Sequence, residues 1–235
     1  MVNRILLFVG FALLLTLFIF LGMWQLNRAE QGASIHQQYD EESRLPPLTG
    51  LVPNNDLDEF RYRWIEVQGE YLSSKQFLLD SMTHEGHVGY HVLTPFKPSN
   101  SVDWMLVNRG WIEANPDRKI LPQVSVGEGT RLVRGRADSL PQPGLSLGEL
   151  TDSGFWPQVM LFPTFDALEA RFERPLVRYQ LLLDAGFSDG FFREWEPRAL
   201  PPERHIGYAI QWFSFAGILA VMVIVLSVRS RMSFE

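Results

Sequence analysis

Two apolar stretches decide the architecture of this chain: ILLFVGFALLLTLFIFLGM, residues Ile5–Met23, and IGYAIQWFSFAGILAVMVIVLSV, residues Ile206–Val228. They are 19 and 23 residues long, and neither contains a charged side chain. An α-helix rises about 1.5 Å per residue, so about 20 apolar residues cross the roughly 30 Å hydrocarbon core of a bilayer. We therefore expect two transmembrane helices in the lipid bilayer, with everything between them on one side.

Basic residues flank these stretches at the two ends of the chain: Arg4 before the first, Arg229 and Arg231 after the second. Short basic segments stay in the cytoplasm, so this pattern places both termini there. The expected parts are a cytoplasmic tail, transmembrane helix 1, a periplasmic domain, transmembrane helix 2 and a second cytoplasmic tail, at residues 1–4, 5–23, 24–205, 206–228 and 229–235. We expect helix 1 to continue into water past Trp24.

A cleaved signal peptide is the alternative for the first stretch. Its apolar run is longer than a signal peptide needs, and no small-x-small cleavage site follows it, which favours an uncleaved anchor. The segment also lacks the Arg- and Ser-rich character of a transit peptide, so the bacterial inner (cytoplasmic) membrane is the expected location.

Composition excludes several classes of function. The net charge is −6, and because the tails contribute three Arg and one Glu, the rest of the chain carries −8. This acidic balance argues against nucleic acid as a partner. The absence of cysteine excludes disulfides, iron–sulfur clusters, Cys-ligated zinc and thiol chemistry.

The region between the spans is expected to be rich in strands. In Arg63–Tyr71, apolar Ile65, Val67 and Tyr71 alternate with polar residues, as in a half-buried strand. Other strands are expected at residues 76–80, 90–96, 104–111, 130–137 and 177–184. One helix is expected over residues 164–172, with Thr164 as its N-cap, and a loop over residues 141–154. The fold class is therefore α+β: two transmembrane helices flanking one strand-rich extracytoplasmic domain built on an antiparallel or mixed sheet.

Motifs of common enzymes are missing: there is no G-x-S-x-G, Walker loop or H-E-x-x-H. A Ser–His–Asp site assembled only in space stays open, but we expect no enzyme. His84, His87 and His91 are close enough in sequence to suggest a copper or zinc site. Gly86 and Gly89 lie between them and favour a solvated turn instead.

A third group of residues lies where both spans leave the membrane. His205 precedes the second span, and on a helix Tyr208 and Trp212 follow it down one face. Trp24, Gln25 and Arg28 emerge from the first span at the same level. Haem would fit here, because imidazole ligates iron, aromatic rings cover the macrocycle and Arg pairs with a propionate. An interfacial aromatic belt is the alternative.

Five motifs resemble those of the Surfeit locus protein 1 family of cytochrome oxidase assembly factors. They are GMWQLNR (22–28), VQGEY (67–71), GYHVLTPF (89–96), LVNRGWI (106–112) and HIGYAIQWF (205–213). They occur in the family's order between two spans. Residues 141–163 match nothing in the family that we can place.

The resemblance implies the two-span topology and a role in assembling haem–copper oxidases. Some bacterial members are thought to bind haem a and pass it to the catalytic subunit. This implies haem a as cofactor, with the oxidase catalytic subunit and the haem a synthesis enzymes as partners. It also implicates His205 and Trp212; that His205 ligates the haem iron is a hypothesis from the chemistry of imidazole. Extending the site to Tyr208, Trp24, Gln25 and Arg28 is an inference from their position.

Two alternatives stay open within this reading. The chain can act as a haem-free scaffold that stabilises an oxidase subunit during assembly. The segment from Asn108 to Trp111 can be structural, with the strand turning at Gly110 and Trp111 filling the edge of the core, or it can form a docking surface for the oxidase.

Overall fold

The structure, a computed structural model, describes residues 2–53, 57–142, 155–197 and 201–232. The chain forms two compact units. One combines the two ends of the chain, Met1–Gln38 and Pro197–Glu235, and the other is Tyr39–Glu196. Each unit is described by itself below.

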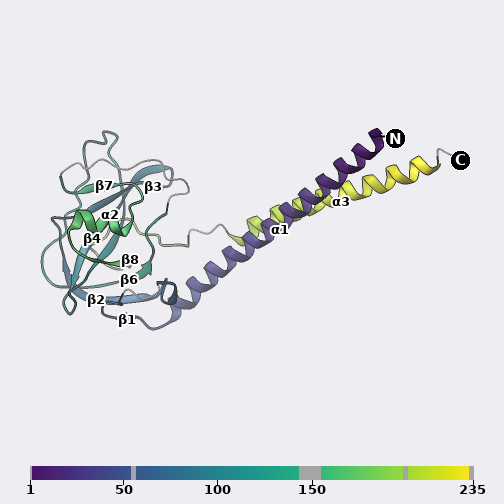
Figure 1. Cartoon of the computed structure of the whole chain (residues 1–235). Coiled ribbons are helices and arrows are strands. Elements are labelled where there is room, and N and C mark those ends of the chain that lie inside the picture. Colours follow the sequence, from purple (N-terminus) through teal and green to yellow (C-terminus); the bar gives the residue numbers. More distant parts are fainter. Residues whose placement is uncertain (1, 54–56, 143–154, 198–200, 233–235) are drawn as a thin grey trace. The chain divides into compact units, whose positions relative to one another are not determined.

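The first unit consists of two long helices, α3 (Pro202–Met232) and α1 (Val2–Arg44) as far as Gln38. They run side by side, and the first turn of α1 lies at the same end as the last turn of α3 (Figure 1). Both are long and apolar enough to cross a membrane, and only 6% and 17% of their most apolar windows are buried. Because these side chains are exposed, the helices are not core helices of a water-soluble domain.

The helices extend beyond the apolar stretches of the sequence. As expected, α1 continues past Trp24, and it ends at Arg44, just before Pro46 and Pro47. Proline disfavours helical conformation in the residue before it, which explains this end. The levels at which the bilayer begins and ends along α1 and α3 stay a prediction.

In its described residues, the second unit is a mixed β-sheet with one short helix, so the α+β class is confirmed. Its strands are β1 (Leu48–Thr49), β2 (Trp64–Tyr71), β3 (Phe77–His84), β4 (His87–Pro98), β5 (Trp104–Glu113), β6 (Arg131–Asp138), β7 (Gln158–Met160) and β8 (Leu176–Leu183). A 3-10 turn covers Leu57–Glu59, and helix α2 covers Phe165–Phe172. Six of the eight strands coincide with predicted ones. The other two, β1 and β7, are two and three residues long, too short for a periodic pattern to be read.

Five strands close into a barrel. They follow the order β2-β6-β8-β5-β4, and β4 pairs again with β2. Closure uses the end of β2, where Gly69 pairs with Pro98 and Tyr71 with Phe96. A Cβ at Gly69 would lie 2.1 Å from the carbonyl oxygen of Lys97, so only glycine allows this close approach.

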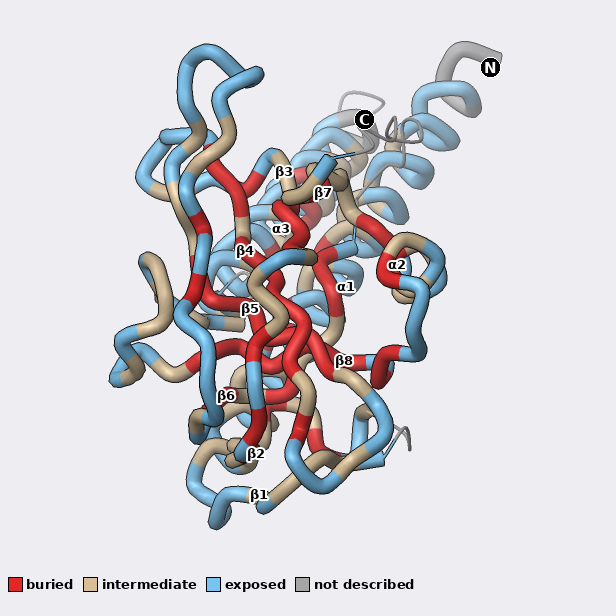
Figure 2. Tube along the Cα trace, turned by 90° about the vertical axis from the view of Figure 1, so that its left-hand side faces the viewer, coloured by how far each residue is buried: buried red, intermediate tan, exposed pale blue. Residues whose placement is uncertain are grey.

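The barrel interior is the main core (Figure 2). The alternation predicted for β2 is confirmed, because Ile65, Val67 and Tyr71 are buried there. They meet apolar residues of the other barrel strands: Phe96, Met105, Val107, Val133, Ala137, Val177, Tyr179, Leu181 and Leu183. Full burial of one such side chain stabilises the fold by roughly 1.5–3 kcal/mol relative to exposure.

Helix α2 forms a second core with the outer face of the sheet. Thr164 is its N-cap, as predicted, and accepts a hydrogen bond of 3.2 Å from the backbone nitrogen of Ala167. Leu168 and Phe172 are fully buried in a cluster that includes Leu93 of β4. Of the loop predicted at residues 141–154, positions 143–154 lie outside the described residues.

One local prediction is wrong: β5 does not turn at Gly110 but continues to Glu113. Gly110 has φ of 108°, and a Cβ there would lie 2.5 Å from the carbonyl oxygen of Phe192. The next residue, Trp111, forms a bridge with Phe192. Glycine is therefore needed for the close approach of a second backbone rather than for a reversal of the chain.

Candidate functional site

The paired helices bring the two groups of predicted site residues together. On α1 the less exposed positions include 11, 15, 18, 22, 25 and 29, and on α3 they include 205, 209, 212, 216, 219 and 223. Spacings of three and four residues place each set on one helix face, as in a coiled-coil seam. The helices are antiparallel, because Gln25 contacts His205 whereas Phe18 contacts Trp212.

His205 is held by a hydrogen bond to the other helix. Its Nδ1 lies 2.7 Å from Oε1 of Gln25, a residue 180 positions earlier in the chain. Both side chains are half-buried at one level of the helix pair. The sequence placed both residues in the site but did not show that they touch.

Trp212 packs between the helices. Its ring stacks on Phe18 with centroids 5.9 Å apart and meets Phe215 edge-on at the same distance. Close by, a Cβ at Gly22 would lie 2.7 Å from the ring of Phe213, so the small residue lets this ring lie against α1. The structure thus gives Trp212 a packing role, and its predicted contact with a cofactor stays a prediction.

Trp24, Tyr208 and Arg28 lie outside the packed seam. Trp24 is 47% exposed and Tyr208 54% exposed. Arg28 is exposed too, and its Nη1 donates a hydrogen bond of 2.9 Å to Oε1 of Gln31 on the same helix. These two rings and this guanidinium are therefore on the surface near the level of His205, where a ligand can reach them.

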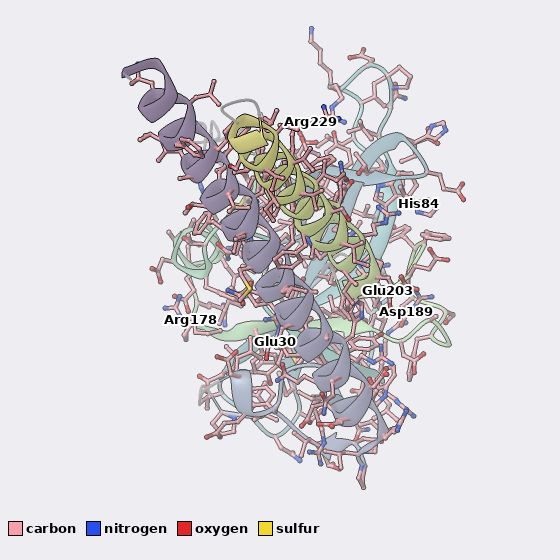
Figure 3. The ribbon with its side chains drawn as sticks, turned by 90° about the vertical axis from the view of Figure 1, so that its right-hand side faces the viewer. Glu30, His84, Arg178, Asp189, Glu203 and Arg229 are labelled. Carbon is pink, nitrogen blue, oxygen red and sulfur yellow. The ribbon has the colours of Figure 1, made fainter. Side chains whose placement is uncertain are left out.

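Charged residues flank the apolar part of the helix pair. Glu30 of α1 and Glu203 of α3 lie toward one end, and Arg229 lies toward the other (Figure 3). Charges on bilayer-spanning helices concentrate at the membrane surfaces, because burying a charge in hydrocarbon is costly. His205 and Gln25 lie next to the end with the glutamates, as residues at a membrane rim would.

This arrangement fits haem chemically. A histidine held by a second hydrogen-bonding residue is the usual form of a metal ligand. Aromatic rings not committed to packing can cover a macrocycle, and an exposed guanidinium can pair with a propionate. The residues that would hold haem are therefore His205, Trp24, Tyr208 and Arg28.

The three histidines of the domain do not form a metal site. His84 and His87 face each other across the β3–β4 hairpin, but His84 packs on Phe192 with centroids 3.9 Å apart. His87 binds Glu113 at 3.0 Å, and Nδ1 of His91 lies 3.3 Å from Nδ2 of Asn108. Within the described ranges, no group of three His, Cys, Asp or Glu residues could hold a metal ion. The solvated-turn interpretation holds for His87, whereas His84 is packed.

The segment from Asn108 to Trp111 is built into the domain. Arg109 is only 3% exposed, and burial lowers the pKa of its guanidinium. Asn108 donates a hydrogen bond of 2.9 Å to Gln180, and the indole nitrogen of Trp111 donates one of 2.9 Å to the carbonyl of Met82. These contacts support the structural alternative rather than the docking surface.

A polar groove of about 540 Å³ lies beside the β2–β3 turn. Its described lining includes Ser73, Ser74, Ser125 and Lys119 but no carboxylate or imidazole. A serine nucleophile needs such a base beside it, so this groove provides no Ser–His–Asp arrangement.

One contributor to the helix seam was missed by the sequence analysis. Phe18, the stacking partner of Trp212, was treated only as part of the apolar stretch. It precedes Gln25 by seven residues, as His205 precedes Trp212, so a heptad comparison of the two spans could have found it.

The chain is similar to several known proteins. The family model described as "SURF1 family" matches residues 12–217. This range includes the end of the first apolar stretch, the start of the second and the whole barrel. A SURF1-like protein of Monosiga brevicollis is 24% identical over 86% of this chain and 80% of its own length. A SURF1-like protein of Drosophila melanogaster is 25% identical over 52% of this chain and 47% of its own length.

A third relative has a descriptive name. The "Cytochrome oxidase assembly protein SHY1" of Saccharomyces cerevisiae is 24% identical over 48% of this chain and 30% of its own length. The chain thus spans less than half of the fruit-fly and yeast relatives that it matches.

Proposed function

The chain belongs to the SURF1 family, and from this membership we infer that it is a membrane-anchored assembly factor for haem–copper (cytochrome c) oxidase. It binds haem a at the rim of the helix pair and assists delivery of the haem to the catalytic subunit. His205 ligates the iron, Trp24 and Tyr208 contact the macrocycle, and Arg28 pairs with a propionate. Haem is then the molecule that this chain delivers, and it does not form a catalytic centre here.

The contact between His205 and Gln25 carries this proposal. It joins the ends of two spans that are 180 residues apart in sequence, at the level where Trp24 and Tyr208 are exposed. A plain aromatic belt at the membrane surface needs neither a partly buried polar contact between the helices nor a histidine at its centre. The relative from yeast named as an oxidase assembly protein supports the cellular role.

A haem-free scaffold is the second candidate, and the packing of Trp212 favours it. Its ring stacks on Phe18 and is occupied by helix pairing. In that case His205 serves only to lock the helices, and the outer faces of α1 and α3 contact a subunit of the oxidase.

The visible absorption spectrum distinguishes the haem-binding assembly factor from the haem-free scaffold. The full chain is purified in detergent from cells that make haem a, beside His205→Ala and the matched control His87→Ala, which removes an exposed histidine of the barrel. We expect a Soret band in the wild type that largely disappears in His205→Ala and persists in His87→Ala. Full haem content in folded His205→Ala would contradict the ligand role. A colourless wild type that still cross-links to the oxidase subunit would favour the scaffold.

We propose the bacterial inner membrane as the location, with both termini cytoplasmic and the barrel periplasmic. The basic residues Arg4, Arg229 and Arg231 at the chain ends support this orientation. The partners are then the oxidase catalytic subunit and the enzymes of haem a synthesis.

A further inference from the structure

The hydrogen bond between the two helices assigns a proton position, an inference that rests on the proposed function for its purpose. We propose that Gln25 is a positioning residue that holds His205 in the tautomer with its proton on Nδ1, so that Nε2 is the nitrogen that ligates iron.

With Oε1 of Gln25 facing the ring, the chemistry of the two groups leads to this assignment. The partner atom of Nδ1 is Oε1 of Gln25, at 2.7 Å. An amide oxygen only accepts hydrogen bonds, so Nδ1 must carry the proton. A neutral imidazole has one proton on its two nitrogens, and Nε2 therefore keeps its lone pair. Only a nitrogen with a lone pair can bind a metal ion.

The surroundings strengthen the contact. His205 and Gln25 are half-buried, and the neighbouring seam residues Gly22, Ala29 and Ala209 are buried. Water competes less for hydrogen bonds in such a place, so the acceptor sets the tautomer more firmly than it would on an open surface. The small residues also let the helices come close enough for the short Gln25 side chain to reach across.

The acceptor Gln25 lies on α1 and the ligand His205 lies on α3, so the tautomer depends on the pairing of the two helices. The His205 ring is prepared for iron only while α1 and α3 are paired at this level. Separation of the helices removes the acceptor, and the ring then returns to the tautomer with the proton on Nε2, which an isolated histidine side chain prefers. That tautomer carries a proton on the nitrogen that would bind iron.

Nitrogen NMR of the haem-free protein tests the tautomer directly. The full chain is labelled with ¹⁵N-histidine and studied in detergent micelles above about pH 8, where an ordinary imidazole is neutral. His205→Ala identifies the signals of His205. We expect Nδ1–H in the wild type and in Gln25→Glu, because a carboxylate also accepts a hydrogen bond, and Nε2–H in Gln25→Leu. An Nε2–H tautomer in the wild type, or Nδ1–H retained in Gln25→Leu, would overturn the inference.

Haemin titration of the same variants tests whether positioning of His205 by Gln25 serves haem binding. Loss of a residue that orients a metal ligand typically lowers affinity about 10- to 100-fold. We expect such a loss in Gln25→Leu and near wild-type affinity in Gln25→Glu. Equal haemin affinity in the wild type and Gln25→Leu overturns the positioning role and leaves the proposed function intact. A wild type that binds neither haemin nor haem a contradicts the proposed function, while the NMR result still decides the tautomer.

Discussion

Arg109 shows how one buried side chain connects distant parts of the barrel. Its Nε donates to the carbonyl of Asp189 at 2.6 Å, and Nη1 donates to the carbonyl of Val124 at 2.7 Å and to Oε1 of Gln76 at 3.1 Å. The guanidinium also lies 5.0 Å from the ring centre of Phe191. A planar guanidinium can make these contacts at once, whereas an ammonium group presents its donors from a single point.

Arg109→Lys is therefore expected to destabilise the protein although it keeps the charge. At least one buried carbonyl loses its donor, which costs about 2 kcal/mol or more. Chemical denaturation of the full chain in detergent, followed by tryptophan fluorescence, measures the change in the free energy of unfolding. The matched control is Arg178→Lys, an exposed residue paired with Asp166, which should change stability by less than about 0.5 kcal/mol. Equal effects of the two variants would contradict the proposed role of Arg109.

Two buried tyrosines predict how the barrel responds to alkaline pH. Burial raises the pKa of Tyr71 and of Tyr179 above the ordinary value near 10. The unfolded chain therefore loses these protons first. The contribution of these two tyrosines to the free energy of unfolding is fully present below about pH 10 and is lost as pH rises further.

Their hydroxyls differ in their partners. The hydroxyl of Tyr179 donates to the carbonyl of Val52 at 3.2 Å, whereas that of Tyr71 is buried and has no partner in the described part of the chain. Tyr71→Phe should leave stability at pH 7 unchanged or raise it by up to about 1 kcal/mol, and Tyr179→Phe should lower it by about 1 kcal/mol. Both should make thermal unfolding less sensitive to pH above 10, as measured by near-UV circular dichroism. A large loss of stability at pH 7 in Tyr71→Phe would contradict this assignment.

At the scale of elements, the antiparallel pairing of α1 and α3 is the feature that assembles the candidate site. Phe18, Gly22 and Gln25 of α1 meet Trp212, Phe213 and His205 of α3. Nearer the chain ends, the helices border an apolar groove of about 340 Å³ lined by residues such as Leu15 and Leu219. In the hydrocarbon core of a bilayer, the hydrophobic effect does not favour pairing of apolar helices. Close packing and the contact of Gln25 with His205 must therefore hold the two helices together.

Gly22→Leu is expected to open this pairing, because even a Cβ at Gly22 lies 2.7 Å from the ring of Phe213. Gly10→Leu is the matched control, since nothing lies within 4 Å of a Cβ there. The chain contains no cysteine, so Leu15→Cys with Leu219→Cys makes a unique pair for a short bis-maleimide. Mass spectrometry of the digest should find the bridged peptides reduced several-fold by Gly22→Leu and unchanged by Gly10→Leu. Undiminished bridging in Gly22→Leu would show that the helices do not depend on this contact.

For the whole molecule, two helices lead into one barrel, and both chain ends belong to the helical unit. If the helices cross a membrane, both ends lie on one side and the barrel on the other. The acidic barrel then faces the compartment opposite to the basic tails.

Reporter fusions test that orientation. Green fluorescent protein fused after Glu235 should fluoresce, because it folds in the cytoplasm. Alkaline phosphatase inserted at the exposed turn at Gly129 should be active, because it needs the oxidising periplasm. Each reporter is also placed at the other position. The reverse pattern would overturn the orientation, and activity of both reporters at one position would contradict a fixed topology.

Features that depend on neighbouring residues could be predicted from the sequence. The two long apolar helices, the alternation of Ile65 and Val67, and the Thr164 cap are local: each follows from side chains a few positions apart. Hydropathy and periodicity carry that information because a helix or strand exposes its pattern along a single segment. The short strands β1 and β7 contain too few residues to carry such a pattern.

Contacts between distant residues were decided only by the tertiary structure. Closure of the barrel at Gly69, the donors that Arg109 directs to Gln76 and Val124, and the contact of Gln25 with His205 join segments far apart in the chain. The sequence named Gln25 and His205 as members of one site, but their pairing depends on the rotation and depth of two helices. Those are set by the packing of the whole seam, because ridges, small residues and aromatic rings must fit at every level at once.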